Sequence, residues 1–277
     1  MTPPLHTAPI VKVLAGQARP GTRIIPEEVP VALVHDGITH AVMMATPADL
    51  EDFALGFAVT EGVARPDQIR DIEVAEQPDG WEVRLWLAPD AGREVTARRR
   101  AILGPTGCGL CGVESLEAAV PPPPRVAEGA RFTIAQVMAA MASLKPAQRL
   151  NAEAHALHAA GFWTPAGGLM ALREDVGRHN ALDKLVGALA RSGVDAGSGI
   201  VLLSSRISVE MVQKAARLGA PALAAASAPT ALALRTGEAA GMTLIGIARS
   251  DGFEVFTRPD RLDLSGGETR GGYLATG

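Results

Sequence analysis

Cysteine and aromatic residues are scarce in this chain of 277 residues, and long hydrophobic runs are missing. Two cysteines are too few to crosslink so long a chain, which excludes a disulfide-stabilised secreted scaffold. Aromatic residues make up 4% of the sequence, so the core must be built from aliphatic side chains. No stretch approaches the ~20 apolar residues of a membrane span, and the first residues lack the pattern of a secretory signal. We therefore expect a cytoplasmic protein that does not enter a membrane.

An excess of positive charge is also missing. Lys and Arg number 26 against 30 Asp and Glu, and the resulting net charge of −4 argues against a surface built for nucleic acid. Hydrophobic residues make up 47% and charged residues 20%, as in ordinary globular proteins, so wholesale disorder is excluded. At about 150 residues per domain, the length predicts two domains, or one large α/β domain with an appendage.

Four consecutive prolines at 121–124 divide the chain, because such a run favours an extended segment and cannot continue a helix. Before it we expect a tail over residues 1–20 and a small α+β domain over residues 21–120. After it we expect an α/β domain over residues 125–262 and a flexible, glycine-rich tail over residues 263–277.

Hydrophobic patterns predict two β-hairpins and one helix in the N-terminal domain. Residues 29–34 and 38–44 flank one turn-type sequence, and residues 72–74 and 81–87 flank another. Between the hairpins, Thr46 is expected to cap a helix whose first residue is a proline. The buried stripe of this helix comprises Leu50, Phe53, Ala54, Phe57 and Ala58.

The C-terminal domain is predicted to alternate between strands and helices. Thr133 and Gln136 form a capping-box pattern at the start of its first helix. Strands are expected at 199–203, 221–226, 242–248 and 253–257, and helices at 208–218 and 229–240. Such alternation predicts a largely parallel sheet that is covered by helices.

The two cysteines, Cys108 and Cys111, form a single CxxC within the glycine-rich run 107–112. In a reducing compartment, a close pair of this kind is reactive or binds a metal. The run also fits the G-x-G-x-x-G spacing of dinucleotide sites, but the four prolines interrupt the crossover that this motif needs. A zinc site would need about four ligands, which only His155 and His158 could complete. The H-x-E motif of zinc deaminases is absent. A buried, inert pair is the structural alternative.

Glycines on both sides of each cysteine predict a bendable loop, unlike the strand–helix junction of thioredoxin-like proteins. Cys111 lies at the start of a predicted short helix, whose partial positive charge would favour a thiolate. A bendable loop with a thiolate is suited to handing a sulfur atom from one partner to another. Two alternatives stay open: a cofactor-holding chaperone whose cysteines sense redox state, and a dithiol oxidoreductase.

Longer motifs around these residues resemble the formate dehydrogenase accessory sulfurtransferase family (FdhD). They are TPADLED at 46–52, CGLCG at 108–112, REDVGRHNALDK at 173–184, SRISVEMVQKA at 205–215 and SAPT at 227–230. The run at 173–184 is long enough to be specific, whereas a CxxC alone is not. The chain departs from the family before His158, where residues 153–157 replace a Thr-Gly-Gly run.

This resemblance implies a sulfurtransferase that accepts persulfide sulfur from a cysteine desulfurase. It implies delivery to the molybdenum bis(molybdopterin guanine dinucleotide) cofactor of a formate dehydrogenase, whose catalytic subunit is a further partner. The persulfide would form on Cys108 with Cys111 assisting, and the cofactor would contact Ile247, Ala248, Arg249, Ser250, Asp251 and Gly252. A homodimer is also implied, as is a three-layer C-terminal domain of cytidine-deaminase-like fold without its zinc.

The strand ends of the C-terminal domain offer groups that a guanine dinucleotide would need. Hydroxyls, arginines and backbone N–H groups bind pyrophosphate, and in a parallel sheet they gather where strands end. Ser205, Arg206 and Ser227 follow two such strands, and the segment from Arg249 follows the third. We also expect Arg178 or His179 to face the ligand.

A structural interpretation of the same residues stays open. Ser208 and Ser227 could only cap helices while the arginines are solvated. Likewise, Asp175 could pair with Arg178. Asn180 and Asp183 would then cap the helix that follows.

Overall fold

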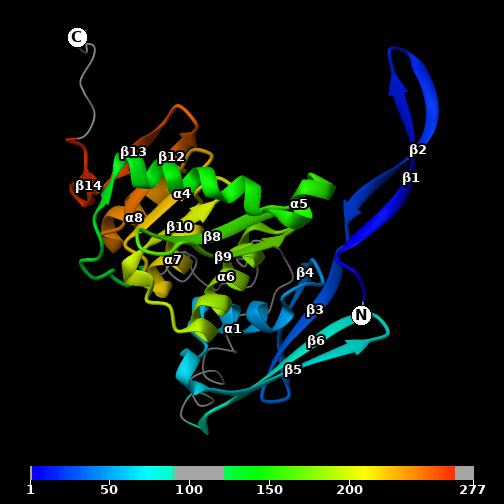
Figure 1. The fold of residues 1–277 in the computed structure, drawn as a ribbon. Coiled ribbons are helices and arrows are strands. Elements are labelled where there is room, and N and C mark those ends of the chain that lie inside the picture. The colour runs from blue at the N-terminus through cyan, green and yellow to red at the C-terminus, as the bar shows by residue number, and fades with distance from the viewer. Residues whose placement is uncertain (1, 90, 92–121, 266–277) are drawn as a thin grey trace.

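The computed structural model describes residues 2–89, 91 and 122–265, which form a mixed α/β structure (Figure 1). The strands are β1 (Leu5–Leu14), β2 (Gln17–Pro26), β3 (Val29–His35), β4 (Ile38–Ala45), β5 (Ile69–Gln77), β6 (Gly80–Leu87), β7 (Phe132–Thr133), β8 (His158–Thr164), β9 (Gly168–Asp175), β10 (Ile200–Leu203), β11 (Ala222–Ala225), β12 (Thr243–Arg249), β13 (Gly252–Thr257) and β14 (Leu262–Asp263). The helices are α1 (Leu50–Thr60), α4 (Ile134–Ala147), α5 (Arg149–Ala154), α6 (Arg178–Ser192), α7 (Val209–Leu218) and α8 (Ala231–Ala240).

The N-terminal unit is a four-stranded sheet in the order β4-β3-β6-β5, with α1 packed on one face. Both predicted hairpins are confirmed, and so is the buried stripe of the helix. The helix begins at Leu50, however, and Asp49 with a φ of 53° occupies the position before it. The expected cap at Thr46 is wrong, because the backbone and hydroxyl of Thr46 are bonded to residues of the C-terminal unit.

Residues 1–20, expected as a tail, instead supply most of a long antiparallel hairpin formed by β1 and β2. The prolines at positions 9 and 20 had argued against a strand. In a two-stranded ribbon, however, each strand has an outer side whose N–H groups need no partner, so prolines are tolerated there. At the other end of the chain, Asp263 pairs in β14, and residues 266–277 lie outside the described residues. The domain boundaries stay predictions.

The C-terminal unit has three layers around a six-stranded sheet in the order β13-β12-β11-β10-β8-β9. Val201 and Leu203 face the core formed with α6, α7 and α8, whereas Ile200 and Leu202 face the core formed with α4. The capping box of Thr133 at the start of α4 is confirmed. The sheet is less parallel than predicted, because only the β10–β11 and β11–β12 pairings are parallel.

The two units are joined by a close crossing of α1 and α6. Neither helix has a side chain at the crossing point, where Gly56 lies against Asp183 and Gly187 lies against Asp52. A Cβ atom at Gly187 would lie 1.9 Å from the carbonyl oxygen of Asp52, and one at Gly56 would lie 1.7 Å from that of Asp183. The backbones are thus in direct contact, which only glycine permits.

We expect Gly187→Ala to lower the free energy of unfolding by about 2 kcal/mol, because overpacking costs about 1–3 kcal/mol or more and exceeds the ~1 kcal/mol gain in helix propensity. Urea denaturation measures the difference. Gly252→Ala is the control, since a Cβ atom there meets no atom within 4 Å. Equal stability of the two variants would contradict the tight crossing.

Candidate functional site

The carboxyl ends of β10, β11 and β12 lie side by side at one edge of the six-stranded sheet. Leu203 pairs with Ala225, and Ala224 pairs with Ile245, so the segments that follow these strands emerge together. The N–H of Ile247 donates to the carbonyl of Ser227 at 3.3 Å. The predicted convergence of three strand ends is therefore confirmed.

The segment from Ile247 to Gly252 forms an irregular hairpin at this edge. β12 continues through Arg249 and turns back at Gly252, so Ser250 and Asp251 occupy the turn, while the preceding Ala248 is buried. Ile247 has a φ of 52°, and the β12–β13 register shifts beside it. A β-branched residue in the left-handed region is strained, and such strain is concentrated at functional sites.

The start of α6 brings Arg178 and His179 to the same edge. His158, the first residue of β8, is adjacent, because the N–H of Ala159 donates to Ser204 Oγ at 2.8 Å directly after β10. Burial lowers the pKa of His158, and the positive charges of Arg178 and His179 lower it further. One guanidinium and two imidazoles are therefore gathered around the end of β10.

The start of α7 adds Ser208 and Glu210 to this group. Ser208 is the N-cap residue, but its side chain makes no capping hydrogen bond. A distance of 3.9 Å separates Glu210 Oε2 from His179 Nε2, longer than a hydrogen bond. Contact with His179 lowers the pKa of Glu210 to about 2, although burial opposes the shift. The sequence analysis missed Glu210, whose position in a first helical turn is ordinary.

Three polar atoms at this edge are buried without a hydrogen-bond partner among the described residues: Arg178 Nε, His179 Nε2 and Ser208 Oγ. They lie at the N-terminal ends of α6 and α7, where unpaired backbone N–H groups carry partial positive charge. Buried polar groups require partners, and an anion would satisfy this set. The carboxylate of Glu210 lies beside two of these atoms, and its contacts with His179 and Ser208 lower its pKa.

The other predicted residues contribute less to this group. Ser205 is buried and donates to the carbonyl of Arg206, so its hydroxyl supports the loop. Arg206 and Ser227 are exposed at the rim. We refer below to the edge formed by His158, Arg178, His179, Ser205, Arg206, Ser208, Glu210, Ser227 and residues 247–252 as the strand-end site.

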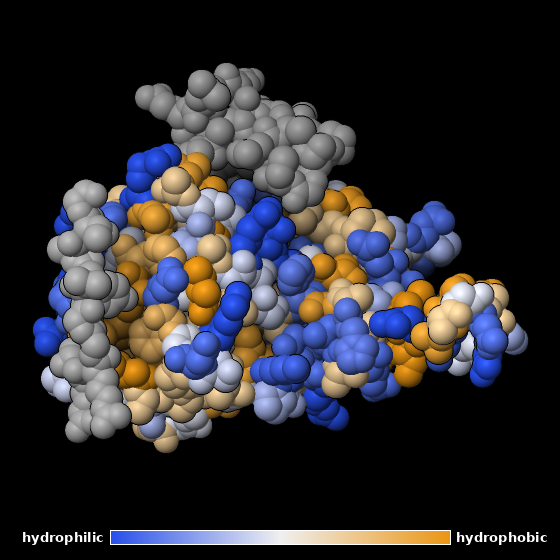
Figure 2. All heavy atoms as spheres, turned by 90° about the horizontal axis from the view of Figure 1, so that it is seen from above, coloured by the Kyte–Doolittle hydropathy of each residue, from blue (hydrophilic) through white to orange (hydrophobic). Residues whose placement is uncertain are grey.

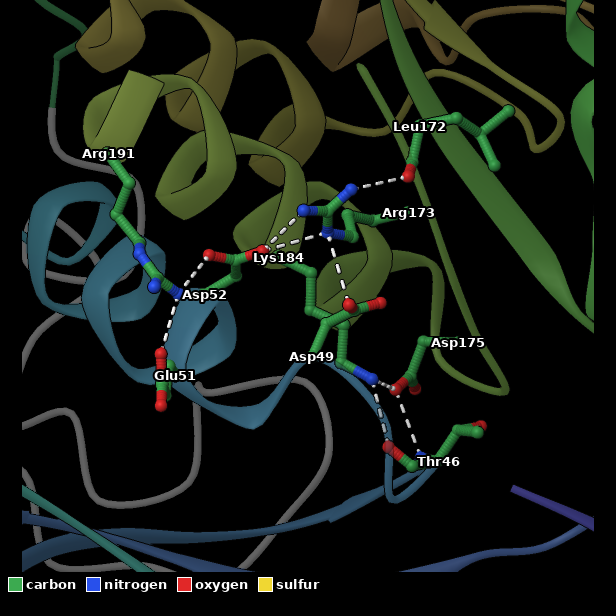
Figure 3. Close-up of polar contacts among 9 residues, drawn as sticks. All are labelled: Thr46, Asp49, Glu51, Asp52, Leu172, Arg173, Asp175, Lys184 and Arg191. Atoms are coloured by element: carbon green, nitrogen blue, oxygen red, sulfur yellow. Dashed lines mark hydrogen bonds and ion pairs between the residues drawn. The ribbon is translucent and has the colours of Figure 1, made fainter. Parts of the chain in front are cut away.

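A buried network anchors the turn that precedes Arg178, and Figure 3 shows the part of it formed by Thr46, Asp175 and Lys184. Asp175, the last residue of β9, accepts from Lys184 Nζ at 2.6 Å, and neither side chain is exposed. Asp175 also accepts from the N–H of Thr46 at 3.0 Å and from the amide of Asn180 at 3.0 Å. The expected pairing of Asp175 with Arg178 is therefore wrong, and Asn180 bonds here and to Met44 instead of serving as a cap.

The contact between the N-terminal and C-terminal units also contains the buried pair of Asp183 with Lys214, and a third acidic residue, Asp52. Asp183, also expected to be a cap, accepts instead from Lys214 Nζ at 2.8 Å and from the hydroxyl of Thr60 at 2.6 Å. Asp52 of α1 accepts from Arg173 at 2.6 Å and from Arg191 at 3.1 Å (Figure 3). Residues of the N-terminal unit therefore hold β9, α6 and α7 behind the strand-end site.

Cys108 and Cys111 lie outside the described residues, so their proposed roles stay predictions. Within residues 2–89, 91 and 122–265, no three His, Cys, Asp or Glu side chains are placed to share a metal ion. His155 is exposed and ends α5 with a φ of 56°. No helix in these ranges has the length and apolarity to cross a bilayer.

Comparison with known proteins identifies close relatives. The sequence profile of the FdhD/NarQ family matches residues 26–263. The sulfur carrier protein FdhD of Agrobacterium fabrum is 52% identical, over 90% of this chain and 93% of the relative. That of Cupriavidus necator is 49% identical, over 94% and 91%.

A solved structure has the same fold. The crystal structure of a protein described as a formate dehydrogenase accessory protein, from Desulfotalea psychrophila, matches with a TM-score of 0.72. The match covers 94% of this chain and all of that one, at 23% identity.

Proposed function

Because the chain belongs to the FdhD/NarQ family, we propose that it is a sulfur carrier that serves a formate dehydrogenase. Relatives that share about half of its residues along nearly the whole chain bear the name of sulfur carrier protein. The observation that carries the finer proposal is the strand-end site, where three orphaned polar atoms and two helix N-termini favour an anionic ligand. One chain thus combines a reactive CxxC with a place for a phosphorylated acceptor.

Sulfur loading requires a thiolate and a persulfide donor, for which a cysteine desulfurase is the proposed source. The Cys108 thiolate attacks the outer sulfur of the donor persulfide. A new S–S bond forms on Cys108 while the S–S bond of the donor breaks, and the donor cysteine leaves as a thiolate. No electrons enter or leave, so the reaction is a persulfide transfer, and the protein acts as a sulfurtransferase.

The proposed acceptor is the molybdenum bis(molybdopterin guanine dinucleotide) cofactor, bound as a substrate. Its pyrophosphates suit Arg178, His179 and the N-termini of α6 and α7. The strained hairpin around Ile247 offers backbone groups at the same edge. The buried network behind Asp175 keeps the turn before Arg178 in place.

Incubation with a desulfurase and labelled cysteine tests the sulfur-carrier proposal. Intact-mass analysis is expected to find one added sulfur atom that a thiol reductant removes, and transfer of that label to the cofactor would follow. A chain that binds the cofactor but never acquires the label would be a chaperone, and the proposal would fail. Reduction of added disulfides without a sulfur adduct would indicate an oxidoreductase.

Arg178→Ala is expected to weaken binding of GDP, a probe that carries guanine and a pyrophosphate, by about tenfold. A hydrogen bond between charged groups contributes about 1.5–3 kcal/mol, and tenfold corresponds to about 1.4 kcal/mol. Isothermal titration calorimetry measures the dissociation constant. His179→Ala is tested alongside, and Arg70→Ala, an exposed arginine on β5, is the control. Unchanged affinity in both site variants would refute the strand-end site.

A further inference from the structure

The hairpin of β1 and β2, here called the arm, has two chemically different faces. Cross-strand partners share a face, and the register places Val11 opposite Pro20 and Val13 opposite Ala18. This face, the apolar face, is formed by Thr7, Pro9, Val11, Val13, Ala18, Pro20, Thr22 and Ile24, none of which is charged. All cations of the arm lie on the other face, the basic face, formed in part by Lys12, Arg19 and Arg23.

Most of the arm is uncovered. Val11 and Val13 are 67% and 66% exposed, and they are among the most exposed large apolar residues of the described chain. The arm packs against α5 near its base and projects away from the body beyond it (Figure 1). Figure 2 shows apolar and hydrophilic residues together on this projection, at the right of the view. A lone two-stranded ribbon is marginal in water, so this length of arm requires a covering surface.

The charge of the arm indicates an anionic partner. Lys12 and Arg19 lie directly opposite each other, a like-charge pairing that destabilises a ribbon. Residues 5–26 contain three of the 26 Lys and Arg and no Asp or Glu, so the arm carries a net charge of +3. The whole chain has a net charge of −4, so the rest of it carries −7. The body of another copy therefore attracts the arm.

The outer face of the four-stranded sheet, on the side opposite α1, carries exposed apolar residues that could contact the apolar face of the arm. Val42 and Met44 of the edge strand β4 are 60% and 48% exposed, and Trp86 of β6 is 41% exposed. They alternate with residues that pack on α1, so they lie on the outer side of the sheet. Val42 and Met44 form an exposed apolar pair at the edge strand, whereas Trp86 is two strands away and Glu82 and Arg84 lie between on the same side.

Carboxylates flank this apolar surface. Asp71, Glu73 and Glu82 lie on the outer side of β5 and β6, where Arg84 forms ion pairs with Glu73 at 3.4 Å and with Glu82 at 3.0 Å. The arm is two strands wide, about 5 Å between strands, so long Lys and Arg side chains reach around it. The surface therefore matches both the apolar face of the arm and its positive charge.

We propose that the arm docks with its apolar face on the outer face of the four-stranded sheet of a second copy of this chain. Exchange of the two arms is reciprocal, so that each copy gives one arm and receives one, as in a closed twofold dimer. Docking occurs through the face of the ribbon, because Pro9 and Pro20 remove N–H donors from its two strands and discourage pairing at its edges.

Crosslinking of the full chain tests directly whether the arm contacts a second copy of the chain. A benzophenone amino acid replaces Val11 in an equal mixture of ¹⁴N- and ¹⁵N-labelled protein, which is then irradiated. The proposal expects peptides of mixed isotope that join the arm to strands β4 or β6. Crosslinks confined to one copy, or none at all, would overturn it and leave the arm to another protein or to a membrane surface.

Matched variants test the two surfaces by analytical ultracentrifugation. Val13→Asp places a charge on the apolar face and is expected to raise the dimer dissociation constant about tenfold or more. Leu14→Asp, at a neighbouring and equally exposed position on the basic face, changes it less than about twofold. Val42→Asp is expected to raise the dimer dissociation constant as Val13→Asp does. Met170→Asp, at an exposed position on β9, is the control for Val42→Asp and should change the constant little. Equal effects within either pair, or a monomeric native chain, would overturn the proposal.

Discussion

Lys184→Ala is expected to lower the free energy of unfolding by about 3–5 kcal/mol, the range for breaking a buried ion pair on one side. The ammonium of Lys184 lies 2.6 Å from Asp175 and 2.9 Å from the carbonyl of Thr46, and its side chain is not exposed. Its removal leaves the carboxylate of Asp175 buried without its countercharge. Urea denaturation, followed by far-ultraviolet circular dichroism, measures the change.

Two controls separate this effect from the loss of any ion pair. Arg65→Ala removes the pair with Asp67, in which both side chains are largely exposed, and should change stability by less than about 1 kcal/mol. The double variant Lys184→Met/Asp175→Leu removes both charges but leaves the N–H of Thr46 and the amide of Asn180 without their acceptor, so it should recover little of the stability. A loss below about 1 kcal/mol for Lys184→Ala would contradict the network described.

Cys108→Ala is expected to abolish sulfur loading, the largest functional effect in this chain. Alanine has no nucleophile, so the donor persulfide cannot transfer its outer sulfur. Mass spectrometry after incubation with a desulfurase is expected to find no sulfur adduct. GDP affinity should stay unchanged, because the residues proposed to bind the pyrophosphate are Arg178, His179 and the N-termini of α6 and α7.

Cys111→Ala is the matched control for Cys108→Ala. The assisting thiol is not the attacking atom, so this variant should still acquire one sulfur atom, at a lower rate. A normal persulfide on Cys108→Ala, or loading lost only in Cys111→Ala, would reverse the assignment of the two cysteines.

The elements that depend on neighbouring residues were predictable from the sequence. The capping box at Thr133, the hairpin of β3 and β4 and the alternation along β6 all follow from residues a few positions apart. The arm and the β8–β9 hairpin were missed. In the arm, Pro9 and Pro20 indicate irregular structure when only neighbouring residues are considered, although the outer edge of a two-stranded ribbon accepts proline.

The candidate site was predictable in outline but not in its internal contacts. The carboxyl ends of neighbouring parallel strands lie at the same edge of a sheet. This general rule predicted that Ser205, Ser227 and Arg249 lie near one another. Glu210 was missed, because its contact with His179 joins two helices. The sequence left Arg178 open as a partner of Asp175, and the structure instead pairs Asp175 with Lys184, nine positions along the chain.

Sequence alone determined the family and most helices and strands of this protein, and it is the sole basis for the proposed role of the cysteine pair, because local periodicity and long motifs are carried by consecutive residues. Only the tertiary structure decided which buried charges pair, which glycines let α1 and α6 touch, and which face of the arm is apolar. The reason is physical. A buried charge is stabilised by whichever opposite charges and hydrogen-bond donors the fold places beside it, and the N–H of Thr46, which donates to Asp175, is 129 positions away along the chain.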